Sequence, residues 1–250
     1  MSRWLLPAAV LAALIGAWQL AASTGAVAEA LDLAPYLVPS PGEIADSLWQ
    51  NRELLADNAW VTLKEVVLGF LLGVVAGVGL AVPIHLSGLL RRSIYPLLIA
   101  SQTIPLLVLA PILVVWFGFG SGPKLAIVAL ICFFPVTVAT VAGLRAVDPE
   151  AIKMMRTLDA SRAQLLWRVE APTALPSFFS GARLAAVFAP IGAVFGEWAG
   201  ADSGLGHMIL LDNGRLETAR VFAAALLLTV IALGLYGLLA LAERRVIRWR

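Results

Sequence analysis

Six stretches of roughly twenty mainly apolar residues recur along the 250-residue chain. They cover residues 4–22, 61–84, 95–117, 125–144, 178–198 and 221–242. An α-helix needs about twenty such residues to cross the hydrocarbon layer of a bilayer, because each residue adds only about 1.5 Å of length. The pattern therefore predicts an all-α protein, a polytopic membrane bundle of about six transmembrane helices.

The composition agrees with lipid as the main solvent. Charged residues make up 14% of the chain, whereas a soluble domain carries about 25%. Hydrophobic residues make up 60%, and the mean hydropathy is +0.90. The single cysteine, Cys132, excludes an internal disulfide framework, and two histidines are too few for a typical histidine-rich metal site. No metal or other bound cofactor is therefore expected.

The first apolar stretch has two interpretations. Arg3, the apolar run and the small residues "AVA" at 26–28 together resemble a secretory signal peptide with its cleavage site. The run is longer than a usual signal core, however, and Trp18 lies near its end. We expect an uncleaved helix, whereas cleavage would leave five spans and change nothing else.

The basic residues predict the orientation in the membrane, since Lys and Arg are retained on the cytoplasmic side. With both termini in the cytoplasm, 13 of the 18 basic residues lie on or near that side. The other five are Arg52, Lys64, Lys124, Arg215 and Arg220. The opposite orientation would need the opposite imbalance, so we expect a cytoplasmic N-terminus and a cytoplasmic C-terminus.

The chain divides into an N-terminal part and a larger transmembrane domain. Residues 1–60 would hold the first transmembrane helix and an external polar loop, and residues 61–245 the rest of the bundle. Within the second part, Gly69, Gly73 and Gly77 repeat at the four-residue spacing that lets helix backbones approach closely. Ordinary packing and a solute route are equally compatible with these glycines.

The longest cytoplasmic loop, residues 145–176, has two helix starts. Asp148, Pro149 and Glu150 supply an N-cap, a first-turn proline and a first-turn acid, which predicts a helix running to Leu158. Ser161 and Gln164 form a capping box for a second helix. We expect this second helix to end at Pro172 and Pro176. Two capped helices projecting from a membrane bundle indicate a docking platform for another protein.

The loop sequence LDASRAQLLWRVEAPTALP (158–176) resembles the cytoplasmic motif of ATP-binding-cassette (ABC) importer permeases. The similarity continues in LVPSPGEIADSLW (37–49), IPLLVLAPILVVWFGFG (104–120) and GEWAGADSGLGHMI (196–209). These segments resemble the nitrate, sulfonate and taurine permeases over residues 35–245. RVEAPTALPSFFSGARLAAVFAPIGAVFGEW and LAERRVIRW resemble most the branch that imports hydroxymethylpyrimidine precursors of thiamine.

The resemblance implies the type I ABC importer permease fold in a bacterial inner membrane. Its expected form is a homodimer that binds two ATPase subunits and receives solute from a periplasmic or lipid-anchored binding protein, with membrane lipid around it and no nucleic acid. ATP and Mg²⁺ would be used by the ATPase, so this chain would be a transport subunit without catalysis. In agreement, GFGSGPK (118–124) lacks the spacing of a phosphate-binding loop.

The expected cargo is a hydroxymethylpyrimidine-like thiamine precursor, and the alternative is a sulfonate, taurine or nitrate. An integral membrane enzyme is the alternative from another class, but it would need clustered Asp, His and Arg at one interface. A passive channel would not need a doubly capped platform.

The resemblance also implies that the two cytoplasmic helices dock on the ATPase as coupling helices. The candidate docking residues are Glu150, Lys153, Arg156, Asp159, Ala160, Ser161, Leu165 and Arg168. Lys153-Met154-Met155 stands where the family motif has E-A-A, and Asp159 stands at its glycine. Glu150, one turn earlier, is a possible substitute for the missing glutamate.

Three polar residues near the spans are pathway candidates. Gln102 and Thr103 could hydrogen-bond a solute, or could satisfy the backbone groups freed by Pro105. Glu197 lies at the end of a span, where an ionisable group is a functional candidate. An interfacial acid reaching external water is the simpler interpretation of Glu197.

Overall fold

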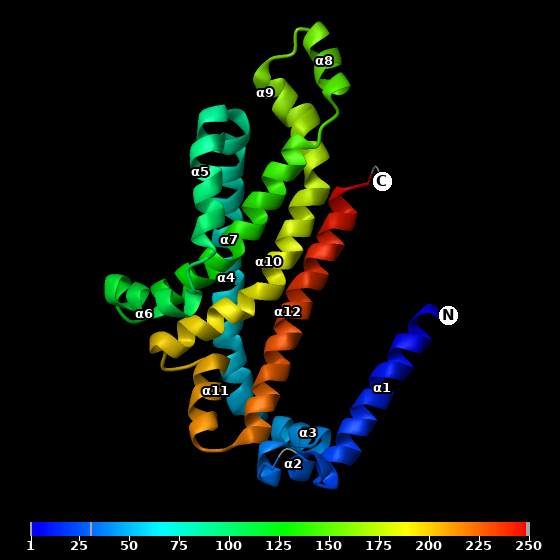
Figure 1. The fold of residues 1–250 in the computed structure, drawn as a ribbon, viewed down its shortest axis with the longest axis vertical. Coiled ribbons are helices and arrows are strands. Elements are labelled where there is room, and N and C mark those ends of the chain that lie inside the picture. The colour runs from blue at the N-terminus through cyan, green and yellow to red at the C-terminus, as the bar shows by residue number, and fades with distance from the viewer. Residues whose placement is uncertain (1, 31, 249–250) are drawn as a thin grey trace. The chain divides into compact units, whose positions relative to one another are not determined.

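A computed structural model describes residues 2–30 and 32–248, and the regular structure in these ranges is helical. Arg250, which is among the basic residues expected in the cytoplasm, lies outside the described residues. The helices are α1 (Ser2–Ser23), α2 (Ala26–Ala30), η1 (Pro35–Leu37), α3 (Pro41–Gln50), α4 (Arg52–Leu86), α5 (Gly88–Ser101), α6 (Leu106–Phe117), α7 (Ser121–Arg145), α8 (Pro149–Thr157), α9 (Arg162–Leu165), η2 (Leu166–Glu170), α10 (Ala171–Gly200), α11 (Leu205–Gly214) and α12 (Thr218–Val246) (Figure 1).

The chain forms two compact units. The first unit comprises Met1–Val61 and Ser203–Leu228. In it, the Gly42 N–H donates to Oε1 of Gln19 over 2.9 Å, and the Gly204 N–H donates to Oδ1 of Asn58 over 2.7 Å. A reciprocal capping box between Ser40 and Glu43 starts α3.

The turn between α11 and α12, also in the first unit, is closed by an ion pair. Arg220 donates through Nε and Nη2 to the two carboxylate oxygens of Asp212, over 2.6 and 2.5 Å. Asp212 is buried, and a two-pronged Arg–carboxylate contact is among the stronger polar contacts in proteins. The pair therefore holds the start of α12 against the end of α11.

The second unit comprises Thr62–Asp202 and Thr229–Arg250, and its core lies along α7 and α10, which pack side by side (Figure 1). Small side chains on α10 allow this close contact, and Ala182, Ala185, Ala186, Ala189 and Ala193 are all fully buried there. They pack against a second set of buried residues from α4 and α7: Val66, Phe70, Val128, Cys132 and Val136.

The glycines of α4 permit a second close contact in this unit, as their spacing predicts. A Cβ atom at Gly69 would lie 2.5 Å from Cβ of Val128, and one at Gly73 would lie 2.7 Å from the carbonyl oxygen of Ala129. Both distances are shorter than a packed Cβ atom tolerates. The helix face that carries these glycines is therefore the surface of α4 that packs against α7.

The third apolar stretch is not one straight helix. Residues 95–117 divide into the C-terminal half of α5 and all of α6, and the axes of α5 and α6 meet at 101°. Pro105 is the N-cap of α6, and the residue before a proline is disfavoured in helical conformation. Among the described residues, five helices are long and apolar enough to span a membrane by themselves, and the bent pair makes up to six.

The prediction that Pro172 and Pro176 end the second cytoplasmic helix is wrong. The helix continues without a break from Arg162 to Gly200, through α9, η2 and α10. η2 is a turn of π-helix, in which the Ala171 N–H donates to the carbonyl oxygen of Leu166, five residues earlier. This shift of the hydrogen-bond register lets Pro172, which has no N–H, enter the first turn of α10.

Candidate functional site

The segment 145–176, called the platform below, begins with α8 and its cap. The Glu150 N–H donates to Oδ1 of Asp148 over 2.9 Å, and Pro149 occupies the first turn. At α9, the Gln164 N–H donates to Oγ of Ser161, while the Ser161 N–H donates to Oε1 of Gln164. Both predicted caps are confirmed.

The turn between α8 and α9 depends on Asp159. Its φ is +53°, in the left-handed region, where the family motif has glycine. Asp adopts this conformation more readily than most residues, because its short polar side chain can hydrogen-bond locally. The Ala160 N–H donates to the carbonyl oxygen of Met155 over 3.1 Å, which closes the turn. Asp159 therefore adopts the left-handed conformation at the position where the family motif has glycine.

Most candidate docking residues are on the surface of the platform. Glu150, Lys153, Arg156, Asp159, Ser161 and Arg168 are exposed, and Ala160 is partly exposed. Leu165 is only 2% exposed, so it supports the platform from inside. Within the described ranges, the Lys and Arg side chains of the platform make no ion pair, which leaves them available to a partner.

Three large apolar side chains of the platform are also exposed, and the sequence analysis did not select them. Met154, Leu158 and Trp167 are 63, 70 and 72% exposed. An exposed apolar patch next to free cationic groups is typical of a protein-binding surface. Their apolar character in a loop predicted to be cytoplasmic was the signal that could have identified them.

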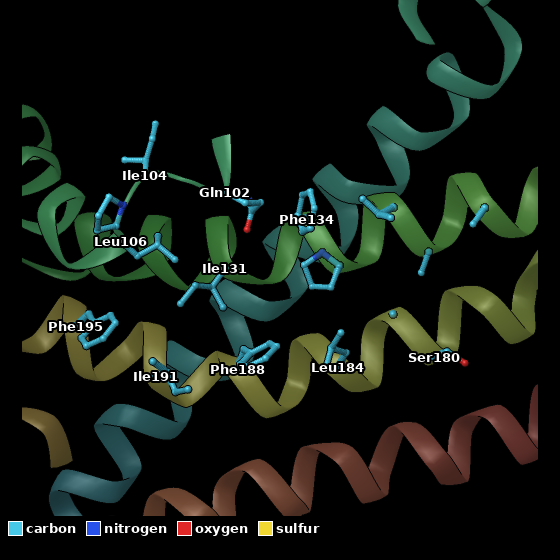
Figure 2. Close-up of a pocket in the computed structure, with 16 residues that line it drawn as sticks. Gln102, Ile104, Leu106, Ile131, Phe134, Ser180, Leu184, Phe188, Ile191 and Phe195 are labelled. Atoms are coloured by element: carbon cyan, nitrogen blue, oxygen red, sulfur yellow. The ribbon is translucent and has the colours of Figure 1, made fainter. Parts of the chain in front are cut away.

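A groove of about 800 Å³ lies between α7 and α10 in the second unit. α10 contributes Ser180, Leu184, Phe188, Ile191 and Phe195, which recur every three or four residues and so share one helix face. Figure 2 shows them in a row along α10, with residues of α7 and the α5–α6 break opposite. The described lining from these other elements includes Gln102, Ile104, Leu106, Ile131 and Phe134.

The three predicted pathway residues have different surroundings in the structure. The exposed side chain of Gln102 reaches the groove, next to α7 in Figure 2. Oγ1 of Thr103 donates to the carbonyl oxygen of Ala100 over 2.8 Å, a local backbone contact. Glu197 does not line the groove.

Glu197 belongs instead to a buried polar cluster of the second unit. It is 1% exposed, so it is not an interfacial acid open to water, and it accepts a hydrogen bond from Oγ1 of Thr62 over 2.6 Å. One turn further along α4, Glu65 forms an ion pair with Lys124 of α7, and both side chains are about nine-tenths buried. The cluster therefore joins α4, α7 and α10 by polar contacts, which sequence inspection could not pair over such separations.

These features together define a class of protein. Several helices long and apolar enough to span a membrane, a groove along two of them and a capped, exposed platform fit a membrane transport protein. The comparisons with known proteins identify the family.

Residues 69–248 match the family described as "Binding-protein-dependent transport system inner membrane component". The chain belongs to this family and is the permease subunit of an ABC importer, a multi-pass inner-membrane transport subunit rather than an enzyme.

Relatives cover nearly the full length of the chain. The "Formylaminopyrimidine transport permease protein ThiX" of Halalkalibacterium halodurans is 36% identical over 217 residues, which are 86% of this chain and 87% of the relative. The "Riboflavin transport system permease protein RibX" of Chloroflexus aurantiacus is 37% identical over 216 residues, 86% of this chain and 81% of the relative.

The fold has a solved counterpart. An inward-facing structure of the MetNI methionine ABC transporter has a TM-score of 0.69 at 19% identity, over 79% of this chain and 98% of that one. The likeness confirms the all-helical permease fold that the sequence predicts.

Proposed function

We propose that the chain works as a homodimer whose two platforms each dock one ATPase subunit, while a solute-binding protein delivers cargo from the external side. In this proposal the termini are cytoplasmic, and ATP and Mg²⁺ are bound by the ATPase alone. Movement of the docked ATPases would tilt the platforms, and the bundle would open alternately to the two sides of the membrane.

The exposed surface of the platform is the observation that carries the docking proposal. Met154, Leu158 and Trp167 give it exposed apolar area, and Lys153, Arg156 and Arg168 add exposed positive charge on the same segment. Ser161 and Asp159 hold the tip in a fixed turn, so that little entropy is lost when it enters a cleft. Glu150 would replace the missing motif glutamate as the acidic contact.

The groove supports a neutral, flat cargo. None of its described lining residues carries a charge, whereas sulfonate, taurine and nitrate have anionic groups that proteins usually bind with Arg or Lys. Phe134, Phe188 and Phe195 can stack on a planar ring, and the Gln102 amide can donate to and accept from its polar edge.

Residues 180–195 of α10 include one basic residue, and its side chain contacts α12 instead of the groove. Arg183 is absent from the groove lining; its Nη2 lies 3.2 Å from Oε2 of Glu243, and its guanidinium stacks over the ring of Tyr236 at 5.7 Å. The uncharged lining of the groove agrees with the names of two relatives. These names specify formylaminopyrimidine and riboflavin, which both contain a planar heterocycle. We therefore propose a hydroxymethylpyrimidine-like thiamine precursor as cargo.

Uptake into liposomes tests the cargo. The chain is reconstituted with its ATPase and supplied with its binding protein and either labelled hydroxymethylpyrimidine or labelled taurine. We expect ATP-dependent uptake of the pyrimidine only, reduced about tenfold by Gln102→Leu, which removes one specific hydrogen-bonding group. Thr103→Ala is the matched control and should leave uptake unchanged. Uptake of taurine in preference to the pyrimidine would contradict the cargo proposal.

A further inference from the structure

A buried polar contact joins the platform helix to the end of α4. Nε2 of His85 lies 2.9 Å from Oε2 of Glu170, and the two side chains are only 10% and 3% exposed. A carboxylate can only accept, so Nε2 of His85 is the donor in this contact. His85 is the last residue but one of α4, and Glu170 is the last residue of η2. Two elements 85 residues apart in sequence are thereby fastened together.

The contact lies where the platform enters the bundle. α9, η2 and α10 form one continuous helix, so any tilt of the platform passes through η2 before it reaches the membrane part of α10. Directly after His85, α4 ends at Leu86 and Ser87 caps α5. Glu170 therefore touches α4 at the point where α4 turns into α5.

The surroundings of η2 leave room for movement. Leu166 packs with Leu144, Ala174 and Val82, but beside this cluster there is an apolar pocket of about 230 Å³ that opens to the surface. A π-turn also carries one residue more than an α-turn needs, and such turns occur frequently at functional sites. The platform helix can thus change its path at η2 without breaking a tightly filled core.

We propose that His85 and Glu170 are a positioning pair that transmits movement of the platform to the α4–α5 junction. The inference rests on the proposed function, because it needs an ATPase that moves the platform.

The test measures the movement itself, with the complete complex of the chain and its ATPase. A spin label is attached to Leu89→Cys, because Leu89 is 75% exposed and lies at the start of α5. Cys132, the chain's own cysteine, is fully buried and should not react. The distance between the labels of the two copies is measured before and after trapping with ATP and vanadate.

Wild-type complex should show a change in this distance on trapping. His85→Ala, Glu170→Ala and the double variant should still co-purify with the ATPase, but the fraction of complex that changes should fall by about tenfold, within the usual range of coupling between sites. The double variant leaves no buried carboxylate without its partner, so it tests coupling even if a single variant folds poorly. Glu170→Gln should restore the change, because its amide oxygen still accepts from Nε2.

Glu243→Ala is the matched control, since it breaks the contact between Arg183 of α10 and α12 without touching η2. It should keep the distance change. An undiminished change in the alanine variants, or an equal loss in Glu243→Ala, would overturn the inference and leave the proposed function intact. If wild-type chain neither binds the ATPase nor responds to trapping, the proposed function fails and the inference fails with it.

Discussion

At the scale of residues, the buried cluster of Thr62, Glu65, Lys124 and Glu197 shows how polar groups persist in an apolar bundle. Each charge that leaves water loses hydration, and only a close opposite charge or hydrogen bond offsets this loss. Glu65 and Lys124 meet this condition for each other, and Thr62 does so for Glu197. The cluster should therefore stabilise the folded chain only as long as its buried polar groups keep their partners.

Removal of one partner tests this. Lys124→Ala would leave the Glu65 carboxylate buried without its counter-charge, and should lower the free energy of unfolding by roughly 3–5 kcal/mol. Lys124→Met combined with Glu65→Leu should recover most of this loss, because both charges of the buried ion pair are then removed together. Unfolding of the purified chain in detergent is the measurement. Lys153→Ala, at an exposed site that forms no ion pair with the residues described here, should change stability by less than about 0.5 kcal/mol.

At the scale of elements, the features that depend on contacts within a few residues could be predicted from the sequence. The caps of α8 and α9 and the left-handed Asp159 involve contacts within a few residues, so they could be expected from Asp148, Ser161 and Gln164. The continuation of the helix past Pro172 could not be expected, because it depends on the π-turn that precedes it. The contacts Glu65–Lys124 and His85–Glu170 join residues distant in sequence, and no local pattern pairs them.

The glycine surface of α4 gives the prediction at this scale. Gly73→Val would place side-chain atoms against the Ala129 carbonyl and Cys132 of α7, and should cost about 1–3 kcal/mol of stability by overpacking. Gly79→Val is the control on the same helix, because nothing lies within 4 Å of its added Cβ atom. In thermal unfolding, the Tm of Gly73→Val should lie clearly below that of Gly79→Val. Equal stability of both would mean that α4 does not meet α7 through Gly73.

At the scale of the whole molecule, the distribution of basic residues predicts how the chain crosses the membrane. Reporter fusions after Arg91 and after Arg162 should give a cytoplasmic signal, and a fusion after Asp202 an external one. The fusion after Arg162 is decisive, because it lies within the platform. An external signal there would place the platform on the side without ATP, and the docking proposal would fail.

Binding of the ATPase by the platform is the central claim, and the tip of the turn between α8 and α9 tests it most directly. Ala160 is partly exposed beside Ser161, and Ala160→Asp would bury an unpaired charge if the tip enters a cleft on the ATPase. Such a charge costs roughly 3–5 kcal/mol when fully enclosed, which weakens binding by about two to three orders of magnitude.

The measurement is co-purification of the ATPase with membrane-inserted wild-type chain and with the variant at equal levels. We predict that wild-type chain retains the ATPase, while Ala160→Asp reaches the membrane normally but loses both the ATPase and uptake. Full retention of the ATPase and full uptake by Ala160→Asp would contradict the account, because the platform would then not be the docking surface.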